Sequence, residues 1–275
     1  MVDRSTGLDV PRVQDIAIAD HAYQQALAYS KMRIQSRPVD GSSASAVAII
    51  HRPDIRRMLS QMRTATEACR ALVAYAAGRQ DLGDTPLAEF LVPLVKGFCT
   101  ELAVQTTCLG VQIPGGMGFI EDTGAAQHCR DARILPIYEG TTAIQANDLL
   151  GRKTLRDDGA TANRLATMIA ETEAALMAIS DTQDIAARLT AARKDFQATI
   201  AHLLTAAPNA AFGAVVPYLM LAGNLLAGWQ MARSALAAHA VSDDFVTSKI
   251  ATARFYVHHI LPETALQRIR ATGAI

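Results

Sequence analysis

Glu139 is a single carboxylate in an apolar segment, PIYEGTTAIQ, which occupies residues 136–145. It precedes an expected helix start, where the positive end of the helix dipole stabilises a carboxylate. We expect the side chains of Leu135, Ile137 and Tyr138 to exclude water, which disfavours the charge. A carboxylate held between these two effects can act as a general base. The local sequence alone favours a second role, that of an ordinary helix cap.

The most glycine-dense stretch is IPGGMGFIEDTGA, residues 113–125. Three glycines within four residues permit positive backbone φ angles and close approach of the backbone to another group. The stretch could be a turn between two helices, which is the simpler interpretation. It could also let backbone N–H groups reach a phosphate or a flat cofactor. No strand is expected before it, so it is not the dinucleotide-binding fingerprint.

Lys31, Arg33 and Arg37 gather at the expected end of the first helix, with Gln35 among them. Cations at a helix C-terminus complement the dipole, so solvated charge is the simplest explanation of this cluster. No Gly-x-Ser-x-Gly elbow occurs in the sequence. The sequence therefore offers no serine nucleophile motif to compete with Glu139.

Four cysteines are present, with no Cys-x-x-Cys pair and no histidine at a spacing typical of zinc sites: Cys69, Cys99, Cys108 and Cys129. We therefore expect no metal site. Buried, reduced thiols are the expected state of all four, and reduced thiols suit a cytoplasmic protein.

The chain has 275 residues, of which 50% are hydrophobic and 19% charged, and its formal net charge is +0. This composition supports a sizeable core and gives no field that would attract nucleic acid or an anionic membrane. Residues 210–229 form an apolar stretch about long enough to span a membrane. Pro217, Tyr218 and Asn224 interrupt that stretch. It is therefore expected to be a buried core helix.

Helical spacing of apolar residues predicts an all-α fold. Thr142 and Gln145 fit a capping box at a helix start near residue 141 or 142. A polar joint over 151–159 predicts a boundary between two domains, 12–153 and 154–275. The expected helices cover residues 12–33, 52–78, 86–111, 122–132, 141–151, 160–180, 182–205, 208–239 and 242–260, with a short one at the end.

Four motifs occur in one order along the chain: SKMRIQ, HRPDIRRML, GVQIPGGMGFIED and RDARILPIYEGTTAIQANDLLGRK. With them the chain resembles the C-terminal half of an acyl-CoA dehydrogenase over about residues 14–153. The ending DLLGRK and the helical patterns after it resemble the extra C-terminal domain of the larger members. The resemblance implies a C-terminal four-helix bundle followed by a second helical bundle.

The resemblance also implies a reaction. Enzymes of this family use FAD to convert an acyl-CoA thioester to the trans-2-enoyl-CoA in fatty acid metabolism, and they pass electrons to an electron-transfer flavoprotein or a similar acceptor. Glu139 matches the family's catalytic base, which removes the α-proton while a hydride moves to the flavin. Members usually form dimers or tetramers through these helices, so a homo-oligomer is expected.

Arg33 and Gln35 match an Arg-x-Gln motif that, in this family, approaches the FAD of a neighbouring subunit. Ser36 departs from the family's usual Phe or Gly after that Gln, which is expected to alter packing near the cofactor without removing the arginine.

Five further positions match residues that lie around FAD in this family. The turn near the adenosine and pyrophosphate supplies three of them, and the positions after the Glu-Gly pair supply two. They are Gln112, Gly115, Gly116, Thr141 and Gln145.

A full enzyme of this family also has a preceding helical domain and a middle β-barrel domain, and neither is recognisable here. The stretch MVDRSTGLDVP stands in place of the family's CoA-lining segment. We therefore expect a truncated chain: a gene fragment, a separately started piece, or one subunit of a split enzyme that another chain completes. Alone, it is expected to have little or no activity. The alternative is a non-catalytic helical remnant or interaction domain that keeps the motifs without binding FAD.

Overall fold

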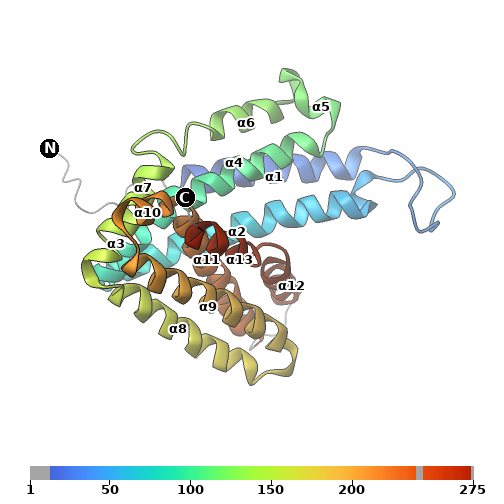
Figure 1. Ribbon diagram of the computed structural model, residues 1–275. Helices are drawn as coiled ribbons and strands as arrows, with labels where there is room; N and C mark the ends of the chain where they lie inside the picture. Colours follow the sequence, from blue (N-terminus) through green and yellow to red (C-terminus); the bar gives the residue numbers. More distant parts are fainter. Residues whose placement is uncertain (1–12, 240–243, 274–275) are drawn as a thin grey trace.

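The computed structural model describes residues 13–239 and 244–273 and is built from helices (Figure 1). Within these ranges there is no strand, only an isolated antiparallel bridge between Ile34 and Ala48. The all-α prediction is confirmed. Residue 12, the expected start of the first helix, and residues 242–243 of a later expected helix lie outside the described residues, as does the MVDRSTGLDVP stretch.

A first bundle is formed by α1, α2, α4 and α6, in which α4 contacts the other three and α1 contacts α2 and α6. Two short 3-10 helices cover Ile49–His51 and Glu121–Thr123. The helices of this half are α1 (Gln14–Met32), α2 (Pro53–Asp81), α3 (Thr85–Pro93), the π-helical turn η4 (Leu94–Phe98), α4 (Cys99–Gln112), α5 (Gly116–Phe119), α6 (Ala125–Ala132) and α7 (Thr142–Gly151).

A second bundle surrounds α11, which packs against α8, α9, α12 and α13 and also reaches α2 and α7 (Figure 1). Two 3-10 helices cover Leu155–Asp157 and Ser180–Thr182. The helices of this half are α8 (Ala160–Met177), α9 (Gln183–Thr205), α10 (Pro208–Gly213), α11 (Val215–His239), α12 (Asp244–His259) and α13 (Glu263–Thr272).

The apolar stretch over 210–229 lies mostly in α11, where Leu219 and Leu225 are fully buried. The prediction of a buried core helix is confirmed. Among the described residues, no helix combines the length and the apolar character required to cross a membrane.

One apolar core is continuous across the two bundles. It joins Leu72 of α2 and Leu149 of α7 with Leu165 of α8 and Leu225 of α11. The two expected domains therefore share buried surface, and their boundary at residues 151–159 remains a prediction.

Two expected helices contain breaks. Residues 86–111 are not one continuous helix, because Pro93 has no N–H with which to bond the preceding turn, and the π turn η4 follows it. Such turns are rare and often lie at functional sites. Residues 208–239 divide at Ala214 into α10 and α11.

The prediction of four buried thiols is correct for two cysteines and wrong for two. Cys69 and Cys99 are buried, but Cys108 on α4 is exposed and Cys129 on α6 is half-buried. The two outer cysteines face each other across the contact between α4 and α6.

Candidate functional site

Glu139 has an unusual backbone conformation. Its φ angle is +54°, in the left-handed region, and the φ of Gly140 is +97°. A residue with a Cβ atom loses about 1–2 kcal/mol in that region, so surrounding contacts must hold it there. Strained residues cluster at active sites, where they fix the direction of a side chain. Ser36 and Asp158 share this conformation, so the positive φ marks Glu139 as a constrained position.

Lys96 anchors the segment that carries Glu139. Its side chain is buried at 6% exposure, and its Nζ donates a hydrogen bond of 2.8 Å to the carbonyl oxygen of Leu135. The same Nζ lies 4.0 Å from the centre of the Tyr138 ring. Lys96 belongs to the π turn η4, so this turn places a buried lysine in contact with the segment that precedes Glu139.

Packing holds the segment as well. Leu135 is buried in a small cluster with Ala19, Ala103 and Ala132. The Tyr138 hydroxyl donates a hydrogen bond of 2.9 Å to Oε1 of Gln14. The backbone immediately before Glu139 is therefore fixed against α1, α4 and α6.

The helix after Glu139 begins one residue earlier than the expected capping box. Thr141 is the N-cap, and its hydroxyl accepts a bond from the N–H of Ile144. Thr142 instead donates its hydroxyl to Glu101 at 2.5 Å, so its assignment to the box is wrong. The Gln145 side chain reaches back and donates to the carbonyl oxygen of Glu139 at 3.4 Å.

The expected exclusion of water from Glu139 by its neighbours is wrong for the chain alone. Glu139 is exposed, and the side chain of Ile137 is 50% exposed. The Leu135 side chain is buried in its alanine cluster, and the half-buried Tyr138 ring lies against Lys96. Neither is enough to bury the carboxylate, because Glu139 remains exposed. Any desolvation of Glu139 has to come from another surface.

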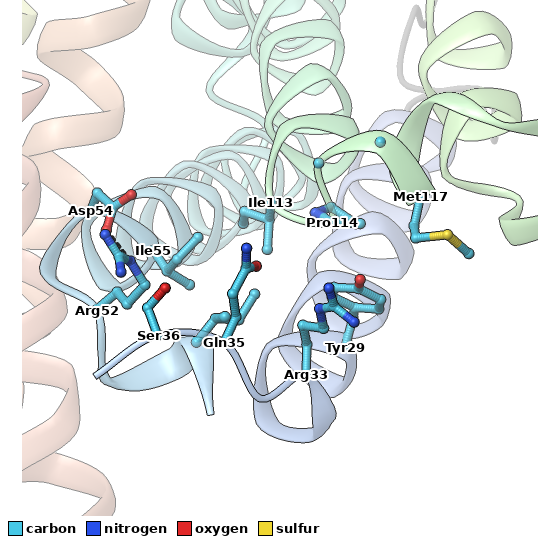
Figure 2. A pocket seen from close by; sticks show the side chains of 13 residues that line it. Tyr29, Arg33, Gln35, Ser36, Arg52, Asp54, Ile55, Ile113, Pro114 and Met117 are labelled. Carbon is cyan, nitrogen blue, oxygen red and sulfur yellow. Dashed lines mark ion pairs between the residues drawn. The ribbon is translucent and has the colours of Figure 1, made fainter. Parts of the chain in front are cut away.

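A separate cleft of about 620 Å³ lies where α1 ends, α2 begins and the glycine-rich turn passes (Figure 2). Four of the predicted cofactor residues line it: Arg33, Gln35, Gly115 and Gly116. The predicted residue Gln112 is not part of its lining.

Several further residues that line the cleft were not predicted from the sequence. Tyr29, one turn before Arg33, and Arg52, paired with Asp54 at 3.5 Å, also line the cleft. Arg52 lies in the HRPDIRRML motif, so its place in a motif of the family resemblance was the sequence signal that could have identified it. Ser36, on the cleft wall, has a φ of +63°, where glycine would avoid strain.

The glycine-rich stretch connects α4 to α6, as its simpler interpretation held, and it includes α5 and the 3-10 helix Glu121–Thr123. Its glycines are required for different reasons. Gly115 has a φ of +64°, and a Cβ atom there would meet no atom within 4 Å. At Gly118 a Cβ would lie 2.0 Å from the carbonyl oxygen of Val111, so close backbone packing requires glycine. Gly118 is structural, whereas Gly115 leaves its backbone open beside the cleft.

The predicted residues thus form two groups at opposite ends of α4. Glu139, Thr141 and Gln145 lie where α7 packs on η4, before the first turn of α4. The cleft lies beyond its last turn, at Ile113. Fourteen helical residues rise about 21 Å, so the two groups are well separated within one chain. Among the described residues, no three histidine, cysteine or acidic side chains gather as metal ligands do.

Comparison with family models identifies both halves of the chain. Residues 5–152 match the model described as "Acyl-CoA dehydrogenase, C-terminal domain". The chain belongs to the acyl-CoA dehydrogenase family. Residues 159–274 match the model described as "Acetyl-CoA dehydrogenase C-terminal like". The family is one of oxidoreductases, and the resemblance found in the motifs is confirmed.

Among curated relatives, the chain is 55% identical to 3-methylmercaptopropionyl-CoA dehydrogenase of Ruegeria pomeroyi, over 94% of this chain and 47% of that protein. It is 34% identical to a broad-specificity linear acyl-CoA dehydrogenase of Mycobacterium tuberculosis, over 90% of this chain and 46% of that protein. The chain therefore spans about half the length of the curated relatives it matches.

Solved structures share the fold at low identity. An acyl-CoA dehydrogenase complexed with FAD from Bacillus anthracis has a TM-score of 0.74 at 20% identity, covering 95% of this chain and 48% of that one. ACDH-11 of Caenorhabditis elegans in complex with C11-CoA has a TM-score of 0.73 at 19% identity, covering 91% and 42%. The expected bundle followed by a second bundle is the fold of this family.

Proposed function

We propose that this chain forms the C-terminal part of an FAD-dependent acyl-CoA dehydrogenase in which Glu139 is the base. The observation that carries the proposal is the conformation of Glu139, which is held with a positive φ between a buried Lys96 anchor and the capped start of α7. A helix cap alone does not require this strain, because Thr141 supplies the cap.

The carboxylate of Glu139 removes the α-proton of an acyl-CoA thioester. Lys96 and Tyr138 fix the segment before it, and Gln145 binds its carbonyl oxygen, so the backbone that carries the carboxylate is already held in place. FAD, when bound, would accept the hydride that leaves the β-carbon.

The residues around the cleft fit the anionic, dinucleotide part of FAD. Arg33 offers a guanidinium group that suits pyrophosphate oxygens, and Arg52 offers a second one, which is paired with Asp54 in the cleft wall. The open backbone at Gly115 and Gly116 allows close approach of a phosphate. Tyr29 adds an aromatic surface beside them.

The separation of the two groups supports a cofactor site shared between two copies of the chain. Arg33 and Gln35 match a motif that reaches the FAD of a neighbouring subunit, whereas Thr141 and Gln145 match positions beside the catalytic base. One copy then holds the flavin end near Glu139, and a second copy supplies its cleft. This arrangement requires the homo-oligomer expected for the family.

Exposed isoleucines near Glu139 in the sequence support a covering surface from a further polypeptide region. Ile134, Ile137 and Ile144 are 53%, 50% and 56% exposed. A further polypeptide region, of the kind present in the longer relatives, would bury these side chains and exclude water from the base.

The experiment is a visible absorption spectrum of the purified chain with added FAD, alone and after co-expression with the N-terminal half of the 55%-identical relative. We expect no retained flavin in the chain alone and a flavin band in the co-expressed complex. Such a complex should be tested first with 3-methylmercaptopropionyl-CoA, the substrate in that relative's name. A colourless complex would favour the non-catalytic interaction domain.

A matched pair of arginine variants tests the cleft. Arg33→Ala removes a cleft guanidinium and should lower the flavin content of the complex, whereas Arg37→Ala changes an exposed arginine outside the lining and should leave it unchanged. Equal flavin content in both variants would remove Arg33 from the site.

A further inference from the structure

Cys108 and Cys129 are the nearest pair of accessible thiols in the described part of the chain. Cys108 lies on α4 and Cys129 on α6, and their Sγ atoms are 3.2 Å apart where the two helices pack together. Cys108 is exposed and Cys129 half-buried, so small oxidants can reach the pair. A disulfide requires sulfur atoms about 2.05 Å apart, so the two sulfurs would have to approach by little more than about 1 Å.

From this geometry we infer that Cys108 and Cys129 form a reversible, intramolecular redox pair that accepts low-molecular-weight disulfides as oxidants. One thiolate attacks the oxidant disulfide and releases one thiol. The second cysteine then attacks the mixed disulfide and releases the other thiol. Two protein thiols lose two electrons, one oxidant disulfide gains them, and both protons leave on the two released thiols.

The disulfide would close a ring around the glycine-rich turn. Residues 108–129 include the end of α4, all of α5 and the start of α6, so Gly115 lies inside the ring. Oxidation would therefore tie α6 to α4 and limit the opening of the segment that borders the cleft. The inference does not depend on flavin binding, and its test requires none.

The thiol chemistry sets the conditions. Partial desolvation where α6 packs beside the otherwise exposed Cys108, the hydrogen bond with Cys129 and the charge of that group raise the pKa of Cys108 to about 11. The thiolate is the reacting form, so exchange should be slow at neutral pH and faster in mildly alkaline solution. This places the pair among slowly oxidised thiols rather than among fast peroxide sensors.

The chain carries an internal control. Cys69 and Cys99 also lie beside each other, but both are buried at 4% and 1% exposure. An oxidant in solution should therefore leave them reduced while it oxidises the outer pair. If proximity of the sulfur atoms alone determined oxidation, both pairs would be oxidised.

The test uses the full chain, reduced, desalted and incubated with oxidised glutathione at mildly alkaline pH. Combined cleavage after lysine, arginine and glutamate puts the four cysteines on separate peptides. We expect a mass loss of two hydrogen atoms in the intact chain and one linked pair of peptides containing Cys108 and Cys129. Cys108→Ser and Cys129→Ser should each abolish that link, and Cys69→Ser should leave it in place.

A second readout follows the consequence of ring closure. Hydrogen exchange of α6 amides should slow by about tenfold or more on oxidation and return to its first rate after addition of dithiothreitol. Four free thiols after oxidation, a link between Cys69 and Cys99, or stable glutathione adducts without ring closure would each overturn the inference.

Discussion

Lys96 should be a major source of stability, because it is a buried cation with two identified partners. The substitution Lys96→Met keeps a flexible side chain of similar length and removes the ammonium group. The variant loses a charged hydrogen bond to the Leu135 carbonyl, a contribution of about 1.5–3 kcal/mol. It also loses the contact with the Tyr138 ring, about 0.5–1 kcal/mol at a partly exposed site.

Together these losses predict a fall of about 2–4 kcal/mol in the free energy of unfolding, measured by urea denaturation. Hydrogen exchange should accelerate most at the amides of residues 137–142. The matched control is Lys153→Met, which breaks a surface ion pair with Glu89 and should cost at most about 1 kcal/mol. A Lys96→Met variant as stable as this control would refute the reasoning, because the desolvation of the ammonium would then cancel its bonds.

Two further predictions concern packing and pH. Gly223→Ala would place a Cβ 2.2 Å from the Phe98 ring and should lower the free energy of unfolding by at least about 1–3 kcal/mol. Gly78→Ala would place a Cβ with no atom within 4 Å and should raise the free energy of unfolding by about 0.5–1 kcal/mol in the same denaturation assay. Burial and the neighbouring His21 ring lower the pKa of His128. The unfolded chain therefore binds a proton at His128 more readily than the folded chain, so the free energy of unfolding should fall as pH drops below about 6.5. His128→Gln should lack the part of this fall that His128 causes, when the two proteins are compared from about pH 8 to about pH 5.

Helix positions were predictable because apolar spacing and the placement of glycine and proline are local signals. The break before η4 had a local signal too, Pro93, although a proline within an apolar run does not reveal that a π turn will follow it. The cap at Thr141 was missed by one residue, because Thr142, not Thr141, has a glutamine three residues later. The Thr142 hydroxyl instead donates to Glu101, which lies far away in sequence.

The anchor of the candidate base was not predictable from spacing. Lys96 stands in the apolar run 91–98, and a buried lysine requires a partner, which the run itself does not reveal. Its partner Leu135 lies 39 residues away, and that contact depends on the tertiary fold. The facing sulfurs of Cys108 and Cys129 depend in the same way on the packing of α6 against α4.

The positive φ of Glu139 was likewise hidden in the sequence, although the following Gly140 marks a turn. Its exposure was predicted wrongly because apolar neighbours along the chain do not necessarily cover a side chain in space. The resemblance in four motifs identified the family, since ordered motifs carry information that local chemistry at Glu139 lacks.

The most direct test of the account is flavin reduction by an acyl-CoA in the co-expressed complex, followed as loss of the visible flavin band without oxygen or another acceptor. The account predicts rapid loss of the band with Glu139 present. In Glu139→Gln, which keeps the shape and removes the base, it predicts FAD still bound and reduction slowed by about 10²-fold or more. Equal rates in the two complexes would show that the base lies elsewhere and would contradict the central claim.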